Sequence, residues 1–86
     1  MNFNSGDFVT TIHSYKPGLV IQKNNLNSLI SIHEYNGDYE WINNTGLQLI
    51  NLLPEEELSI IANFGEWFYE EHKNLYQEII LKNINI

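Results

Sequence analysis

The sequence contains no cysteine. Disulfide bonds and thiolate metal sites therefore cannot supplement the core of this 86-residue chain. A chain of this length forms one domain, and its stability depends on each large apolar residue. We expect a single domain over residues 1–86. Small proteins without disulfides suit a reducing compartment, so we expect the protein in the cytoplasm.

Arginine is absent as well, and the four lysines face eleven acidic residues, which gives a net charge of −7. Clustered Lys and Arg normally bind nucleic acids and anionic membranes, so we expect neither as a partner. No apolar run approaches the ~20 residues that span a bilayer, and no signal-peptide pattern opens the chain. The charge favours a protein partner with a basic surface, and it also promotes solubility.

Proline occurs only twice, and the chain changes character at the second one, Pro54. Residues 1–53 carry strong turn signals and alternating apolar residues, with a net charge of −2 (two Lys against two Asp and two Glu). Residues 54–86 carry seven Glu and two Lys, a net −5, on a helical rhythm. We predict a β-sheet over 1–53 and an acidic amphipathic helical extension over 54–86. The expected strands are 7–13, 19–21, 28–35, 38–43 and 47–50.

The stretch HEYNGDYEW, residues 33–41, predicts a β-hairpin. Asn36-Gly37 is the preferred pair for a two-residue type I′ turn, because both positions need a positive φ. That turn places Ile32 opposite Trp41, and it places His33 opposite Glu40 as a surface pair. One face of the hairpin would then form half of a core. Its expected members are Ile30, Ile32, Tyr39 and Trp41.

The second half of the chain predicts one or two helices. Pro54 suits the first helical position, and Glu55, Glu56 and Glu57 follow in the first turn, where the helix dipole favours negative charge. A buried stripe follows at three- and four-residue spacing, and Gly65 favours a break within it. The stripe consists of Ile61, Phe64, Phe68, His72, Leu75 and Ile79.

The turn and core positions of residues 6–50 follow a recurring pattern: Gly-Asp-hydrophobic-Val, Gly-hydrophobic-Val, a hairpin ending in Glu-Trp-hydrophobic, and Leu-x-x-Ile. This pattern resembles the small SH3-like β-barrels encoded in bacteriophage and bacterial genomes. The resemblance implies an α+β protein, with a bent antiparallel SH3-like barrel of about five strands followed by the helices. The matching residues are Gly6, Asp7, Val9, Gly18, Val20, Gly37, Glu40, Trp41, Ile42, Leu47 and Ile50.

The same resemblance bears on function. In KOW and Tudor relatives the loops between strands bind nucleic acid or methylated side chains, but the basic residues of the first group are absent here. Phage proteins of this size are often host-takeover or accessory factors, and the resemblance implies that association.

Residues that carry chemistry are sparse. The chain has no nucleophile elbow, triad or Gly-rich phosphate loop, so we expect no enzyme. His33 with Glu40 supplies too few ligands for zinc. Glu70-Glu71-His72 matches neither HExxH nor Glu-x-x-His, and His72 falls on the inner stripe, where we expect a partly buried, hydrogen-bonded ring. We therefore expect no metal and no cofactor.

The aromatic run in residues 64–69 cannot face one core, because successive helical residues point about 100° apart. Trp67 and Tyr69 either cover the sheet or anchor a partner interface. Ile84 and Ile86 near the end of the chain also need a docking site. The candidate partner-binding residues are Glu55, Glu56, Glu57, Glu66, Trp67, Tyr69, Glu70 and Glu71.

These residues favour a non-enzymatic interaction protein that binds a basic surface, such as a phage-encoded inhibitor or accessory factor. A DNA mimic is a special form of this hypothesis, and it requires the carboxylates along one exposed strip. The alternative is a structural component of a virion or homo-oligomer, with the helix as the assembly face. A third option is a barrel that binds a ligand beside Tyr39 and Trp41.

Overall fold

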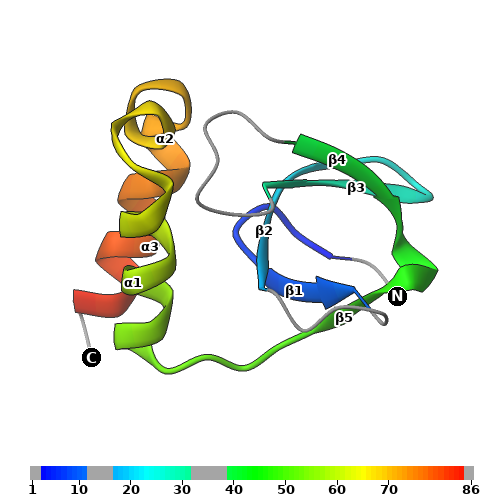
Figure 1. Cartoon of the computed structure of the whole chain (residues 1–86), viewed down its shortest axis with the longest axis horizontal. Helices are drawn as coiled ribbons and strands as arrows, with labels where there is room; N and C mark the ends of the chain where they lie inside the picture. Colours follow the sequence, from blue (N-terminus) through cyan, green and yellow to red (C-terminus); the bar gives the residue numbers. More distant parts are fainter. Residues whose placement is uncertain (1–2, 12–16, 32–38, 85–86) are drawn as a thin grey trace.

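The described part of the chain forms five short strands followed by three helices (Figure 1). A computed structural model describes residues 3–11, 17–31 and 39–84, and the expected Asn36-Gly37 turn, Ile12, Ile32, His33 and Ile86 lie outside these ranges. The predicted α+β class is confirmed, with three C-terminal helices instead of one or two. The elements are β1 Phe8–Thr11, β2 Gly18–Lys23, β3 Asn27–Ser31, β4 Tyr39–Asn43, the 3₁₀ helix η1 Asn44–Gly46, β5 Leu47–Leu49, α1 Pro54–Phe64, α2 Glu66–Glu71 and α3 Lys73–Ile84.

All strand pairs are antiparallel, and the strand order is β4-β3-β2-β1-β5. The two edge strands, β4 and β5, are consecutive in the chain and are joined only by η1. In a flat sheet these edges would lie ~19 Å apart, at ~4.8 Å for each strand spacing. Three 3₁₀ residues rise only about 6 Å. The connection therefore bends the sheet strongly, yet β4 and β5 do not pair within the described residues, and the sheet is not closed into a barrel.

The predicted register of the hairpin is wrong. Trp41 pairs with Leu29 and Glu40 pairs with Ile30, a shift of three residues from the expected partners Ile32 and His33. An odd shift moves the side chains of one strand to the other face of the sheet. Trp41, expected in the core, is accordingly 50% exposed, whereas Ile30 is buried.

A buried polar pair accounts for the observed register. The Ser28 hydroxyl donates a hydrogen bond of 2.6 Å to the side-chain oxygen of Asn44, and both residues are buried. The backbone N–H of Asn44 also donates to the Leu26 carbonyl at 2.8 Å. A shift along the strand would leave these buried groups without partners, which costs ~1–3 kcal/mol for each group.

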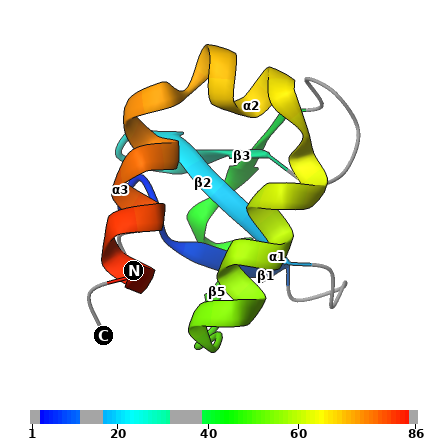
Figure 2. The same ribbon diagram turned by 90° about the vertical axis from the view of Figure 1, so that its left-hand side faces the viewer.

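Strands β1 and β2 are buried on both faces of the sheet, because their side chains alternate between two cores. The first core lies inside the bend and unites residues of all five strands with the N-terminal segment. Its members are Phe3, Val9, Val20, Ile30 and Leu47, with Ile42 packed against them. The second core lies between the sheet and the helices, which cover β1 and β2 in Figure 2. Its members are Phe8, Leu19, Ile21, Ile61, Phe64, Phe68, Leu75 and Ile79.

The helical stripe predicted from residue spacing is confirmed. Its five apolar members are buried, and His72 is partly buried. The predicted break at Gly65 is also confirmed, since Gly65 ends α1 and precedes α2 with φ +83° and ψ −172°. A second break, at His72, was not predicted. Here the backbone leaves helical geometry (φ −130°, ψ 47°), and α3 starts in a new direction.

Gly65→Ala should lower the free energy of unfolding by about 1–3 kcal/mol, because its backbone lies in a region that is almost exclusive to glycine. An added Cβ would have space, with Trp67 Cδ1 at 3.9 Å, so the cost is conformational. Urea unfolding of the wild type and the variant measures this loss of stability. Gly46→Ala is the matched control. The added Cβ would lie 3.8 Å from Ile42 Cγ2, an ordinary van der Waals contact, so the free energy of unfolding should change by no more than about 0.5 kcal/mol. Equal effects of the two substitutions would contradict this explanation.

Candidate interaction surface

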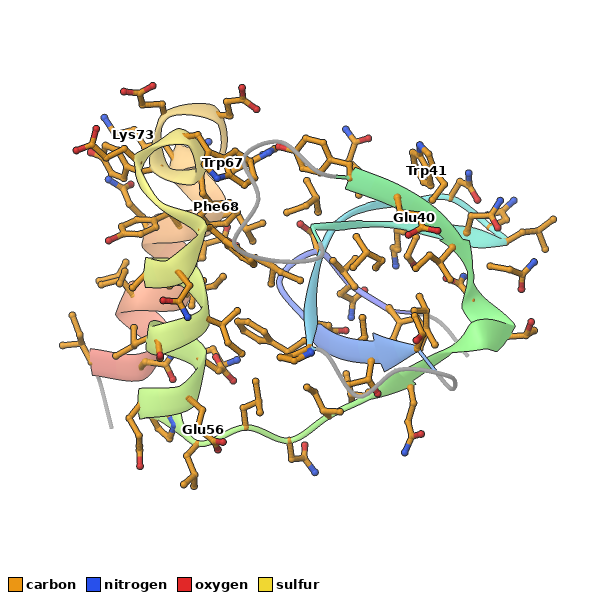
Figure 3. All side chains as sticks on the ribbon, in the orientation of Figure 1. Glu40, Trp41, Glu56, Trp67, Phe68 and Lys73 are labelled. Carbon is orange, nitrogen blue, oxygen red and sulfur yellow. The ribbon has the colours of Figure 1, made fainter. Side chains whose placement is uncertain are left out.

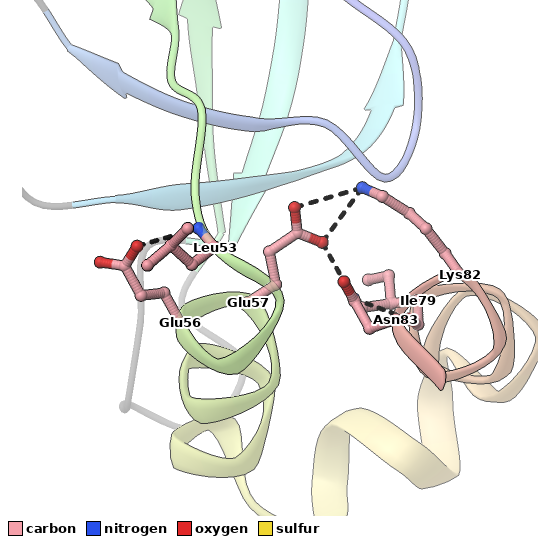
Figure 4. A network of polar contacts seen from close by, with 6 residues as sticks. All are labelled: Leu53, Glu56, Glu57, Ile79, Lys82 and Asn83. Atoms are coloured by element: carbon pink, nitrogen blue, oxygen red, sulfur yellow. Dashed lines mark hydrogen bonds and ion pairs between the residues drawn. The ribbon is translucent and has the colours of Figure 1, made fainter. Parts of the chain in front are cut away.

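The three glutamates in the first turn of α1 have different roles. Glu56 accepts a hydrogen bond from the Leu53 backbone N–H at 2.9 Å and so caps the helix (Figure 4). Glu55 is exposed. Glu57 is only 8% exposed and points toward α3. Only Glu55 and Glu56 therefore remain on the surface of this turn.

The Glu57 carboxylate is neutralised inside the protein. Lys82 Nζ lies 3.0 and 3.2 Å from its two oxygens, and Asn83 Nδ2 donates to Oε1 at 3.1 Å. Asn83 Nδ2 also contacts the Ile79 carbonyl oxygen at 2.9 Å, which ties the network to the α3 backbone. This network joins the start of α1 to the end of α3. Glu57 consequently leaves the set of predicted partner-binding residues, and Lys82 is occupied within the chain.

The other glutamates of the predicted partner-binding set divide between α1 and α2, whereas the exposed Glu78 lies within α3. The 11 residues of α1 extend ~16 Å and separate its first turn from α2. Figure 3 shows Glu56 at one end of the layer and Trp67 with Lys73 at the other. The predicted acidic residues therefore do not form one continuous strip of the kind a DNA mimic requires. The acidic residues of α2 (Glu66, Glu70 and Glu71) are all exposed.

The two predicted aromatic anchors also differ. Tyr69 is 41% exposed, and its ring packs on Tyr76 at a centroid distance of 5.1 Å. Trp67 is partly buried against the second core, with its ring 5.8 Å from those of both Tyr39 and Phe68. Its Nε1 is buried and has no hydrogen-bond partner in the described part of the chain. Tyr69 is therefore available to a partner, whereas Trp67 mainly packs the helices onto the sheet.

Tyr39 links the sheet to the joint between α2 and α3. Its hydroxyl donates to Glu71 Oε2 at 3.2 Å and is also in hydrogen-bond contact with His72 Nε2. The partly buried, hydrogen-bonded ring predicted for His72 is therefore confirmed. Burial, followed by the hydrogen bond to Glu71 and its negative charge, raises the pKa of Tyr39 to about 12. Sequence reasoning missed this link because it joins residues more than thirty positions apart.

One surface hollow of about 770 Å³ lies between β1, β5 and α1, and Thr10, Gln48 and Ser59 contribute to its walls. Neither Tyr39 nor Trp41 lines it, so it is not the aromatic pocket considered from the sequence. In residues 3–11, 17–31 and 39–84 no group of three or more His, Asp or Glu side chains is arranged to hold a metal ion. None of the described helices combines the length and apolar character needed to cross a membrane.

Comparisons with known proteins do not identify a relative. No protein-family model, no curated protein and no solved structure matches this chain.

Lys82→Met should lower the free energy of unfolding by about 1–3 kcal/mol, because the buried Glu57 carboxylate would keep only the Asn83 contact. Urea unfolding at low and high salt is the measurement. Lys73→Met is the matched control. Lys73 is exposed, and its Nζ lies 5.9 Å from the centre of the Tyr69 ring, so its loss should change the free energy of unfolding by less than about 1 kcal/mol. If Lys82→Met lowered the free energy of unfolding by less than Lys73→Met, the structural role of the Glu57 network would be refuted.

The raised pKa of Tyr39 predicts a loss of stability at alkaline pH. The pKa of Tyr39 rises from 10.0 in the unfolded chain to about 12 in the folded protein. The neutral hydroxyl therefore contributes fully to the free energy of unfolding below pH 10, and this contribution is lost as the pH rises toward 12. The stability difference between the wild type and Tyr39→Phe should therefore narrow across this window. Urea midpoints measured as a function of pH provide the comparison. A constant difference would show that Tyr39 ionises normally.

Proposed function

We propose that this protein is a non-enzymatic acidic interaction module that binds a basic surface on a protein partner. The observation that carries the proposal is the α2 end of the helical layer, where Glu66, Glu70 and Glu71 are exposed around the partly exposed Tyr69. An exposed aromatic ring supplies contact area, and the surrounding carboxylates supply attraction and a fast association rate.

The charge distribution supports this proposal. Residues 54–86 contain seven Glu and two Lys, and the charges of Glu57 and Lys82 offset each other within their ion pair. Six Glu and one Lys remain, so this part of the chain still carries a net charge of −5. A surface of this sign attracts a basic partner and repels nucleic acid.

The proposal includes a more specific form, a phage-encoded inhibitor or accessory factor that acts in the host cytoplasm. Its support is the resemblance of residues 6–50 to small SH3-like barrels, together with a strand order that brings β5 beside β1 and a connection that bends the sheet. The helical layer then carries the partner-binding residues.

The alternative proposal is a structural component that assembles through its helices. Leu81 and Ile84 of α3 favour it, because they are 58% and 65% exposed. A stable symmetric oligomer in light scattering would support assembly, whereas a monomer at all concentrations would support the interaction module.

The double variant Glu66→Lys/Glu70→Lys tests the proposed function. Both residues are exposed, so the fold should persist while the net charge changes from −7 to −3. Affinity capture from host lysate, compared at low and high salt, should lose the partner that the wild type retains at low salt. The dissociation constant of that partner should rise by about tenfold or more.

Glu40→Lys/Glu55→Lys is the matched control. It changes the charge equally at two exposed positions outside α2, so it should weaken binding much less. Equal losses in the two double variants would indicate attraction by net charge alone, without a site at α2. Unchanged affinity and salt dependence in both would refute the proposal.

A further inference from the structure

The surface hollow between β1, β5 and α1 is large enough for a small organic ligand. Its volume is about 770 Å³. Ligand sites in proteins commonly enclose ~300–1,000 Å³ and combine apolar walls with a few polar groups. The exposed glutamates of α2, namely Glu66, Glu70 and Glu71, do not line this hollow, so it is separate from the surface that is proposed to bind a protein.

The sheet forms one wall of the hollow. Phe8 of β1 points toward the helices and belongs to the second core. Thr10 lies two residues farther along the strand and therefore on the same face of the sheet, and Gln48 of β5 pairs with it directly. Both Thr10 and Gln48 line the hollow. The helix-facing side of the sheet thus changes from apolar at Phe8 to polar at this pair.

Helix α1 forms the opposite wall. Its residues Ile61 and Phe64 point into the second core, whereas Glu55 and Ser59 line the hollow from another side of the helix. Positions 55 and 59 are one helical turn apart, so their side chains are neighbours. The short side chain of Ser59 leaves space between α1 and the sheet, where the larger core residues fill it.

The remaining wall is aliphatic. Ile50, Leu52 and Ile60 line the hollow and are each partly buried, so they present apolar surface to it. None of the described residues that line the hollow is aromatic, so a planar ring would find no stacking partner there. The walls therefore favour a ligand with a flexible aliphatic body.

The charge of the hollow is negative. Glu55 and Glu56 line it, and its described lining residues include no Lys or His. Arginine does not occur in the chain. Glu56 accepts the Leu53 backbone N–H through Oε1, and Glu55 is exposed. An ammonium group carries three N–H donors, so it complements the carboxylates together with the Ser59 hydroxyl.

We propose that this hollow binds a small aliphatic amine. Its ammonium group is held by Glu55, with Glu56 and Ser59 as further acceptors, and its alkyl chain lies along Ile50 and Leu52. The proposal does not depend on the protein-binding surface at α2, so each of the two can fail alone. The lysine side chain is also an alkyl ammonium, and the experiment separates a free amine from a lysine of a protein.

The probe is n-hexylamine, which is an ammonium ion at neutral pH. Its titration into the isotopically labelled full chain, at fixed ionic strength, should shift the methyl resonances of Leu52 and Ile60 saturably, with a dissociation constant of about 1 mM. Ethylamine keeps the charge but has a much shorter chain, and hexanoate keeps the chain length but reverses the charge. Each should bind at least about tenfold more weakly than hexylamine.

Two pairs of variants test whether the hollow itself is responsible, and all four positions are exposed, so the fold should persist. Glu55→Gln should weaken hexylamine binding by about threefold or more, whereas Glu78→Gln makes the same charge change outside the hollow and should bind as the wild type does. Ser59→Leu places a larger side chain in the hollow and should abolish binding. Ala62→Leu is its control, because Ala62 of α1 does not line the hollow.

Three results would overturn the proposal. The first is the absence of saturable shifts at Leu52 and Ile60. The second is equal affinity for hexylamine and ethylamine, unchanged in Ser59→Leu, because attraction by net charge would then suffice. The third is tighter binding of Nα-acetyl-lysine N-methylamide than of hexylamine, because the occupant would then be a lysine of a protein. None of them decides the proposed function, whose test is the loss of a captured partner in Glu66→Lys/Glu70→Lys.

Discussion

Four consecutive residues at the start of β2, Gly18 to Ile21, are buried, and the rest of the structure depends on this strand. Val20 points into the bend of the sheet, whereas Leu19 and Ile21 point toward the helices. A strand buried on both faces contributes apolar area to two cores at once, which matters in a chain of 86 residues because the surface it can bury is limited. The helices therefore complete the core of the sheet and hold a fixed position on it.

The proposed recognition site depends on that fixed position. The Glu57–Lys82 pair holds α1 and α3 together within the helical layer, and the Tyr39 contact to Glu71 attaches α2 to β4 of the sheet. The carboxylates left outside these contacts are consequently held on ordered helices. Preorganisation of this kind lowers the entropic cost of binding, since few backbone segments must become ordered when a partner arrives.

The sequence predicted the features that depend on local spacing. The buried helical stripe and the break at Gly65 follow from residues a few positions apart, and both are present. The hairpin register was wrong because it depends on the buried Ser28–Asn44 hydrogen bond, which joins residues 16 positions apart. The burial of Glu57 was missed for a similar reason. A glutamate in a first helical turn is normally exposed, and only the return of α3 brings a lysine to it.

Native-state hydrogen exchange tests the central claim most directly, namely that sheet and helices share one cooperative core around β2. The backbone amides of Leu19 to Ile21, together with those of Ile61 in α1 and Ile79 in α3, should exchange only through global unfolding, with one common free energy and denaturant dependence. The contradicting result is exchange of the α1 and α3 amides through a separate opening of clearly lower free energy while β2 stays protected. The helices would then be a detachable extension, and the sheet would not hold the acidic surface in place.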